Sequence, residues 1–252
     1  MAHVRRRALA LCKSQGFCIR RLDYSETSQV VTFYTRDEGR VDLIAKGAKR
    51  KRSAVGGRID LFACGEVVFV RRQRGGLHVL AEFSASERFD GLRRSLQRAY
   101  SAFYVAELVD RGLYEGEANR SFYEFCVATL GQLAGGESVD VTRMIFEAHW
   151  LDVMGVAPQT RQCVECGGPL PRRGQVAFGV GRGGALCPRC APPDAQQVPA
   201  AVLGVVEGLR RASPQSADRI AIARRDVAFV RRVLRGCVVH ALERQPRMLE
   251  LV

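Results

Sequence analysis

The first third of the chain alternates between short segments typical of β-strands and clusters of turn residues, and this alternation constrains the fold more than any other feature. The segments rich in β-branched and aromatic residues span residues 16–22, 28–35, 40–47, 59–72 and 76–83. Gly, Asp and Ser residues separate them at short intervals, as hairpin turns require. Because closing such a sheet removes its exposed edges, we expect a small barrel, with an OB-type barrel as the first choice and an SH3-like barrel as the alternative.

After residue 83 the apolar residues recur with the period of a helix instead. Helical segments are expected within residues 88–113, 121–134, 140–154, 198–212 and 225–245. Ser121 and Glu124 have the spacing of a capping box, and Asp140 is placed to cap the third helix. The apolar stripes of these helices indicate the core of a helical domain rather than a ligand pocket.

Four cysteines form the strongest chemical signal. Cys163 and Cys166 make one C-x-x-C pair, Cys187 and Cys190 make a second, and 20 residues separate the two pairs. Two such pairs can complete the tetrahedral all-sulfur set that structural Zn²⁺ prefers. Four thiolates leave no open coordination position, so we expect a structural rather than a catalytic zinc, with an iron–sulfur cluster or a redox dithiol as the alternative. The Gly-rich segment between the pairs is expected to form loops or a short hairpin without a core of its own, which the metal cross-links.

The other five cysteines stand singly among mostly apolar residues, and we expect them to be small buried hydrophobic side chains. They are Cys12, Cys18, Cys64, Cys126 and Cys237. The nine cysteines show no disulfide pattern of a small scaffold, and the apolar stretch Ala8–Cys12 is too short for a signal sequence or a membrane span. These features predict a protein of a reducing cytoplasm with no membrane partner.

The chain is strongly basic, and its charge is unevenly distributed. It carries 39 Lys and Arg against 26 Asp and Glu, a formal charge of +13. Residues 1–80 hold a net +10, residues 81–160 a net −5 and residues 161–252 a net +8. Blocks of positive charge are typical of proteins that bind nucleic acid or an acidic partner. At 47% hydrophobic and 26% charged residues, the composition excludes collagen-like, disordered and membrane-spanning classes.

A run of cations, KGAKRKR at residues 46–52, lies between two of the expected strands. A Gly-flanked basic loop on a barrel can follow a phosphate backbone and gain affinity by releasing counterions. Further cations flank the neighbouring turns, so the predicted DNA-binding residues are Arg36, Arg40, Lys46, Lys49, Arg50, Lys51, Arg52, Arg71, Arg72 and Arg74. Tyr24 and Tyr34 could stack on bases, although anchoring the barrel is the simpler role. The Arg-rich last helix, around residues 224–235, is a second candidate surface. Binding of DNA, binding of a partner protein and simple solvation explain its arginines equally well.

The sequence contains no motif that predicts catalysis. No P-loop is present. The segment ERFDGL has the form of a K-x-D-G adenylation motif, but Arg88 stands where the nucleophilic lysine belongs, and a guanidinium is not nucleophilic. We therefore expect a protein that is not an enzyme. A zinc-ribbon protein that binds RNA or takes part in transcription is an alternative class, because it would share the basic barrel and the four cysteines.

The run from Arg21 to Arg50 resembles the amino-terminal signature of the bacterial RecO family of recombination mediators. The positions that match the family pattern are Tyr24, Glu26, Val30, Val31, Arg36, Gly39, Lys46, Gly47 and Arg50. The resemblance continues through the helices, the paired C-x-x-C and the segment VPAAVL, so it covers nearly the whole chain. Each motif alone is weak, but their order and spacing together are specific.

The resemblance implies an α+β fold, with an N-terminal OB-type β-barrel followed by an α-helical domain that carries a four-cysteine zinc-binding insertion. The expected bounds are 1–83 for the DNA-binding OB domain, 84–160 and 197–252 for the two parts of the helical domain, and 161–196 for the insertion. The family further implies a cytoplasmic, nucleoid-associated protein of recombinational DNA repair. Such proteins bind single- and double-stranded DNA, anneal complementary strands, associate with RecR and with single-strand-binding protein, and help to load RecA.

Overall fold

The computed structural model describes residues 11–72 and 76–252, which form two compact units. The first unit comprises the described residues up to Asp90 together with residues 109–127, and the second comprises residues 91–108 and 128–252. The division passes through helices α1 (Leu96–Gly112) and α2 (Arg120–Gly135), so each unit includes part of both helices.

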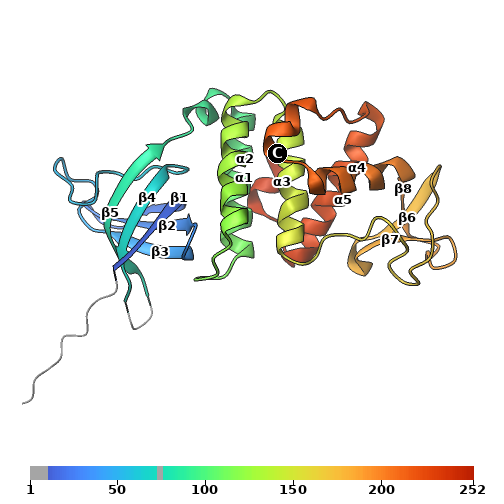
Figure 1. Cartoon of the computed structure of the whole chain (residues 1–252), viewed down its shortest axis with the longest axis horizontal. Coiled ribbons are helices and arrows are strands. Elements are labelled where there is room, and N and C mark those ends of the chain that lie inside the picture. Colours follow the sequence, from blue (N-terminus) through green and yellow to red (C-terminus); the bar gives the residue numbers. More distant parts are fainter. Residues whose placement is uncertain (1–10, 73–75) are drawn as a thin grey trace, which may run out of the picture. The chain divides into compact units, whose positions relative to one another are not determined.

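The first unit is built on a closed five-stranded barrel (Figure 1). Its strands are β1 (Leu11–Asp23), β2 (Gln29–Thr35), β3 (Gly39–Ala45), β4 (Cys64–Val70) and β5 (His78–Glu87). They follow the order β1-β2-β3-β5-β4, and β4 pairs with β1 to close the ring. All pairings are antiparallel except the short parallel contact between β3 and β5. This arrangement confirms the prediction of an OB-type domain.

Three of the barrel strands begin within two residues of the predicted start, and the other two begin five residues away from it. Strand β1 begins already at Leu11, because its first half pairs with β4. The residues Lys13–Gln15 in that half are neither β-branched nor aromatic, so the sequence pattern did not indicate a strand there. Strand β4 begins at Cys64 rather than at Ile59, because Phe62 has a φ of 65° and this left-handed residue interrupts the extended chain.

Alternate residues of the strands point inward and fill the barrel. In β3, for example, every second residue is buried from Gly39 to Ala45. The core cluster consists of Cys18, Val31, Phe33, Val41, Leu43, Ala45, Ala48, Val55, Ile59, Ala63, Val67, Phe69, Leu80 and Phe83. Strands β4 and β5 approach so closely that a Cβ added at Gly65 would lie 2.0 Å from the carbonyl oxygen of Ser84. Only glycine fits at that position without a shift of the backbone.

The second unit is mainly helical. Besides its parts of α1 and α2 it contains α3 (Val139–Val153), α4 (Ala200–Arg211) and α5 (Arg224–Ala241), and all five helices lie within the segments predicted from the apolar period or within one residue of them. The fully buried Trp150 donates its indole N–H to the Leu108 carbonyl at 3.0 Å, which links α3 to α1. No helix in the part of the chain that the structure describes is long and apolar enough to cross a membrane.

The helix caps differ from the prediction. Helix α2 begins at Arg120, and Asn119 caps it by accepting the Phe122 N–H on its side-chain oxygen at 3.0 Å. The predicted cap residue Ser121 therefore lies inside the first turn. Asp140 also lies within the first turn of its helix, where its carboxylate accepts a hydrogen bond from Arg143 at 3.0 Å and another from Arg231.

A small three-stranded sheet precedes α4. Its strands are β6 (Gln175–Gly179), β7 (Gly184–Leu186) and β8 (Gln196–Pro199), in the order β7-β6-β8. Cys163, Ala177, Leu186 and Cys187 form a small buried cluster on this sheet. The expectation that the insertion lacks a core was therefore wrong, because two of the paired cysteines themselves pack with the apolar residues of β6 and β7.

Candidate metal centre and nucleic-acid interface

Two tight turns present the paired cysteines. In the first turn, the Cys163 carbonyl accepts the N–H of Gly167 and the Cys163 N–H donates to the Gly168 carbonyl, both at 2.9 Å. Gly167 has a φ of 68°, which favours glycine and lets the chain reverse immediately after the second cysteine of the pair. In the second turn, the Cys187 carbonyl accepts the N–H groups of Cys190 and Ala191, both at 3.0 Å. Each C-x-x-C thus folds so that its two thiols lie on one side of a turn.

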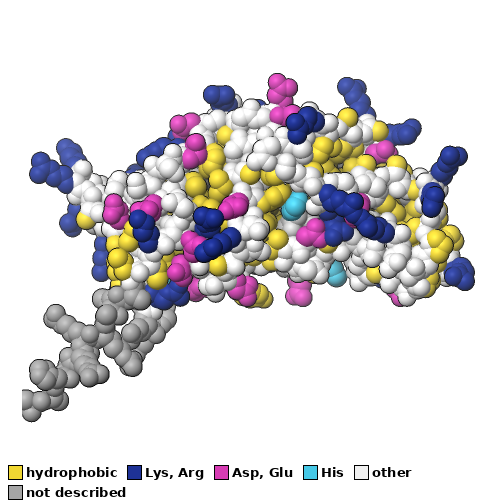
Figure 2. All heavy atoms as spheres, in the orientation of Figure 1, with side chains coloured by type: hydrophobic (Ala, Val, Ile, Leu, Met, Phe, Trp, Pro, Cys, Tyr) yellow, Lys and Arg dark blue, Asp and Glu magenta, His cyan; other side chains and the backbone are white. Residues whose placement is uncertain are grey.

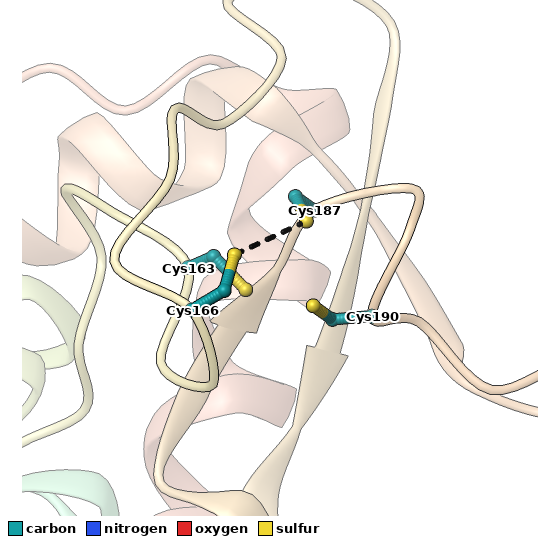
Figure 3. Close-up of side chains that lie close together, drawn as sticks. All are labelled: Cys163, Cys166, Cys187 and Cys190. Atoms are coloured by element: carbon teal, nitrogen blue, oxygen red, sulfur yellow. Dashed lines mark hydrogen bonds between the residues drawn. The ribbon is translucent and has the colours of Figure 1, made fainter.

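The four thiols converge on one point, as Figure 3 shows. Their sulfur atoms all lie within 4.8 Å of one another, and the Sγ atoms of Cys166 and Cys187 are 3.7 Å apart. Sulfur atoms bound tetrahedrally at about 2.3 Å from a zinc ion would be separated by roughly 3.8 Å, so the observed spacing fits a metal ion at the centre. It is too long for a disulfide bond, and all four cysteines are free thiols. The cluster can therefore hold a metal ion.

The surroundings of the cluster favour thiolate character on some of its sulfurs. A hydrogen bond from the backbone N–H of Cys187, supported by the N–H groups of Cys166 and Glu165, lowers the pKa of the Cys163 thiol to about 6. Cys190 hydrogen-bonds to the sulfurs of Cys187 and Cys166, which raises its pKa to about 12. A bound cation would take the place of the protons on these thiols.

The single cysteines behave differently. Cys18, Cys64, Cys126 and Cys237 are buried as predicted, whereas Cys12 is half-buried. Burial raises the pKa of the Cys18 and Cys237 thiols to about 12. Cys18, Cys64, Cys126 and Cys237 are therefore packing groups and lie outside the metal-ligand cluster.

The basic run lies in the long loop between β3 and β4, and the barrel core holds this loop in place. Ala48, Val55 and Ile59 are buried in the core cluster, with exposed fractions of at most 4%. The Ile59 N–H donates to the side-chain oxygen of Gln29 at 3.0 Å, and the Val55 carbonyl accepts the Phe83 N–H at 3.2 Å. Arg50, Lys51 and Arg52, in the segment between these anchors, are exposed.

Four cations of this loop remain free for a ligand, and we call them the loop cations. They are Lys46, Arg50, Lys51 and Arg52. All four are exposed, and none of them forms an ion pair with another residue in the described ranges 11–72 and 76–252. Figure 2 shows Lys and Arg side chains gathered at the end of the barrel where this loop lies in Figure 1.

Lys49 belongs to the same run but has a different environment. Its side-chain ammonium group donates to the Ser25 carbonyl at 2.9 Å and lies 3.4 Å from the Asp23 carboxylate. Its backbone N–H donates to the Thr27 carbonyl at 3.0 Å. Lys49 therefore fixes the loop to the β1–β2 turn.

The other predicted DNA-binding residues lie at the opposite end of the β2–β3 hairpin, and several of them pair with carboxylates. Arg36 lies 3.1 Å from Glu124, and Arg71 is paired with Glu38. Arg72 is exposed and donates its backbone N–H to His78 at 3.2 Å. The two ends are separated by the seven residues of β2, or roughly 20 Å. Arg74 lies outside the described residues.

Arg40 is the most enclosed of the predicted DNA-binding residues. Its Nε donates to Asp110 at 2.8 Å and its Nη2 to Asp42 at 3.2 Å. Burial disfavours the charged guanidinium, but the hydrogen bond with Asp110 and the charges of both carboxylates outweigh it and raise the pKa of Arg40. The side chain joins β3 to the end of α1 within the first unit.

The two candidate stacking residues have opposite environments. Tyr34 is fully buried, packs edge-on against Phe17 with ring centroids 5.9 Å apart, and donates its hydroxyl to the Asn119 carbonyl at 3.4 Å. It anchors the barrel, so its role as a base-stacking residue is excluded in this conformation. Tyr24 is 65% exposed in the β1–β2 turn, beside the residues that hold Lys49.

Comparison with protein families gives matches over almost the entire chain. The model described as "Recombination protein O N terminal" matches residues 9–89, and the model described as "Recombination protein O C terminal" matches residues 93–250. The first match covers the barrel, and the second covers the helices and the cysteine cluster.

Individual relatives agree with the family models. The chain is 33% identical over 239 residues to the DNA repair protein RecO of Roseiflexus sp. (strain RS-1), covering 94% of this chain and 83% of the relative. It is 34% identical over 189 residues to the DNA repair protein RecO of Bacillus subtilis (strain 168), covering 75% and 72% of the two chains. The chain therefore belongs to the RecO family of recombination and DNA repair proteins.

Proposed function

We propose that this chain is a non-enzymatic recombination mediator that binds single- and double-stranded DNA and anneals complementary strands. The observation that carries the proposal is the set of loop cations, Lys46, Arg50, Lys51 and Arg52, which are exposed and unpaired within the described residues on an anchored loop of an OB-type barrel. Cations in this arrangement can neutralise successive phosphates of a nucleic-acid backbone. Because phosphate contacts carry little sequence information, such a surface suits both strands of any duplex.

The paired cations define the limits of this surface. Arg36, Arg40, Lys49 and Arg71 form ion pairs in the free protein, so a phosphate would have to compete with a carboxylate for them. We assign them a supporting role, in which they keep the hairpins in position. Arg72 is exposed and extends the surface toward the other end of the hairpin.

The cysteine cluster supplies stability rather than chemistry in this proposal. Cys163, Cys166, Cys187 and Cys190 would hold one structural Zn²⁺, which leaves no coordination position for a substrate. The bound metal would cross-link strands of only three to five residues to the two turns that carry the cysteines.

Membership of the RecO family extends the proposal to partners. We infer that the chain works with RecR and single-strand-binding protein, and that it thereby assists the loading of RecA. The barrel provides the DNA surface for these steps, and no nucleotide hydrolysis by this chain is required.

Annealing of labelled complementary oligonucleotides without nucleotide tests the proposal. A cationic protein that screens the phosphates of both strands should accelerate their pairing. We expect annealing faster than the spontaneous rate once the protein saturates the single strands. Annealing at the spontaneous rate, together with higher affinity for a structured RNA than for DNA, would instead assign the chain to the RNA-binding zinc-ribbon class.

A further inference from the structure

A second basic surface lies in the second unit, where the small sheet meets helices α4 and α5. A hollow of about 490 Å³ opens there, lined among others by Arg172 and Arg173 before β6, Ala200 and Ala201 at the start of α4, and Arg225 and Phe229 of α5. The hollow lies between the turn before β6 and the starts of α4 and α5. None of its residues takes part in the cysteine cluster.

The hollow has an excess of positive charge. Arg172 and Arg173 are exposed and form no ion pair with any residue of the described ranges. Asp226 provides the single carboxylate among the residues that line the hollow, and it lies 4.0 Å from Arg225. The start of α4 has no side-chain cap, so the positive end of its dipole adds to the field of the arginines. The hollow is therefore suited to an anionic ligand.

An aromatic platform adjoins these charges. Phe229 lines the hollow, and the guanidinium of Arg232 lies over its ring, 5.5 Å from the ring centroid. Arg232 also lines a second, larger hollow of about 840 Å³, which continues along α5. Arg225, Phe229, Arg232 and Gly236 are spaced by four, three and four residues, so they follow one face of the helix.

The turn after β6 forms the other wall of this second hollow. Val180 and Gly181, in the turn after β6, line it together with Gly236 and Val239 of α5. The two walls approach closely, because a Cβ added at Gly236 would lie 3.0 Å from Val180 Cγ2. We call the combined surface, from Arg172 and Arg225 to Gly236, the α5 groove.

We propose that the α5 groove binds a single strand of nucleic acid, separate from the strand held by the loop cations. The assignment of the ligand rests on the proposed function, since annealing requires that two strands meet on the protein. In this assignment the exposed Arg172 and Arg173 contact phosphates, and the Phe229–Arg232 stack contacts a base. An acidic peptide would satisfy the arginines but would leave the aromatic stack without a specific role.

Native mass spectrometry of the full chain with a short oligothymidine tests the inference, because this probe cannot pair with itself. The variant Arg173→Glu/Arg225→Glu reverses one cation on each wall of the first hollow. The matched control Arg219→Glu/Arg244→Glu reverses two exposed arginines of the same unit that line neither hollow. We expect two strands per chain for the wild type and for the control, and one for the groove variant.

Two further measurements separate the possible outcomes. Metal content and melting temperature equal to those of the control show that the groove variant is folded. Phe229→Ala should weaken binding of the second strand while the first strand stays bound.

Two strands per chain in the folded groove variant, or an acidic peptide that binds the groove where oligothymidine does not, would overturn the inference. A wild-type chain that anneals strands but binds only one strand would also overturn the inference, and would leave the proposed function intact. A chain that binds two strands but does not anneal them would contradict the proposed function alone.

Discussion

The barrel and the cysteine insertion both order short β-strands, but by different means. The barrel has strands of seven to thirteen residues, a closed ring and a core with several aromatic rings, so hydrophobic burial can hold it together. The insertion has strands of three to five residues, and its buried cluster consists of Ala177, Leu186 and two cysteines. Val176, Phe178 and Val198 of the small sheet are buried as well, but we expect a cluster of four side chains not to hold the two cysteine turns in place without a cross-link. The comparison indicates that the barrel is a self-supporting domain, whereas the insertion depends on its metal.

Loss of the metal site should have the largest effect on folding. The variant Cys163→Ser/Cys166→Ser removes two of four ligands, and structural zinc sites in small peptides contribute about 10–16 kcal/mol to folding. We expect the wild type to contain about one zinc ion per chain and the variant to contain none. Hydrogen exchange should become fast in the small sheet but should stay slow in β1–β5.

The half-buried Cys12 offers the matched control for this change. Cys12→Ser removes a thiol of the barrel that belongs to no ligand set, so metal content and exchange in the insertion should stay as in the wild type. A metal-free wild-type protein, or a variant whose small sheet exchanges as slowly as before, would contradict the dependence of the insertion on metal.

A cavity in the barrel should destabilise the barrel and leave the metal site of the insertion unchanged. Phe33 is fully buried, with its ring centroid 5.0 Å from that of Phe83, and truncation of such a side chain to alanine costs about 3–5 kcal/mol. We expect Phe33→Ala to accelerate exchange throughout β1–β5 while the zinc content is unchanged. Val30 is half-buried and lies on the opposite face of β2, so Val30→Ala should lower the free energy of unfolding by clearly less. Loss of zinc in the Phe33 variant would show that the two regions do not fold separately.

Much of the fold could be predicted from the sequence because local signals and tertiary structure agree. The β-branched runs of the barrel, the helical period and the two C-x-x-C pairs each predicted the observed element. The misses concern the start of β1, which pairs with the distant β4, the small core of the insertion, and single residues at the starts of β4 and α2. The left-handed backbone of Phe62 interrupts a run that looks continuous in the sequence, and Asn119 caps α2 where Ser121 and Glu124 had the expected spacing.

The candidate DNA surface was less predictable than the metal centre. Cysteine spacing determines where four sulfurs can meet, but the spacing of arginines does not show which of them already have a carboxylate partner. Arg40 and Asp110 are 70 residues apart in the sequence and lie 2.8 Å apart in the structure. The sequence could therefore indicate a basic region, whereas the distinction between loop cations and paired arginines required the fold.

The salt dependence of single-stranded DNA binding tests whether the loop cations form the DNA surface of the barrel. In the variant that changes Lys46, Arg50, Lys51 and Arg52 to Glu, the small sheet and the barrel should stay folded, because these side chains make no ion pair in the described chain. We expect the affinity for the first strand to fall and the slope of log affinity against log salt to decrease by about 3, since each lost phosphate contact removes about 0.7 from the slope. The variant Arg219→Glu/Arg244→Glu should leave both quantities close to those of the wild type. An unchanged affinity and slope in the loop variant would contradict the assignment of the loop cations as the DNA-binding surface of the barrel.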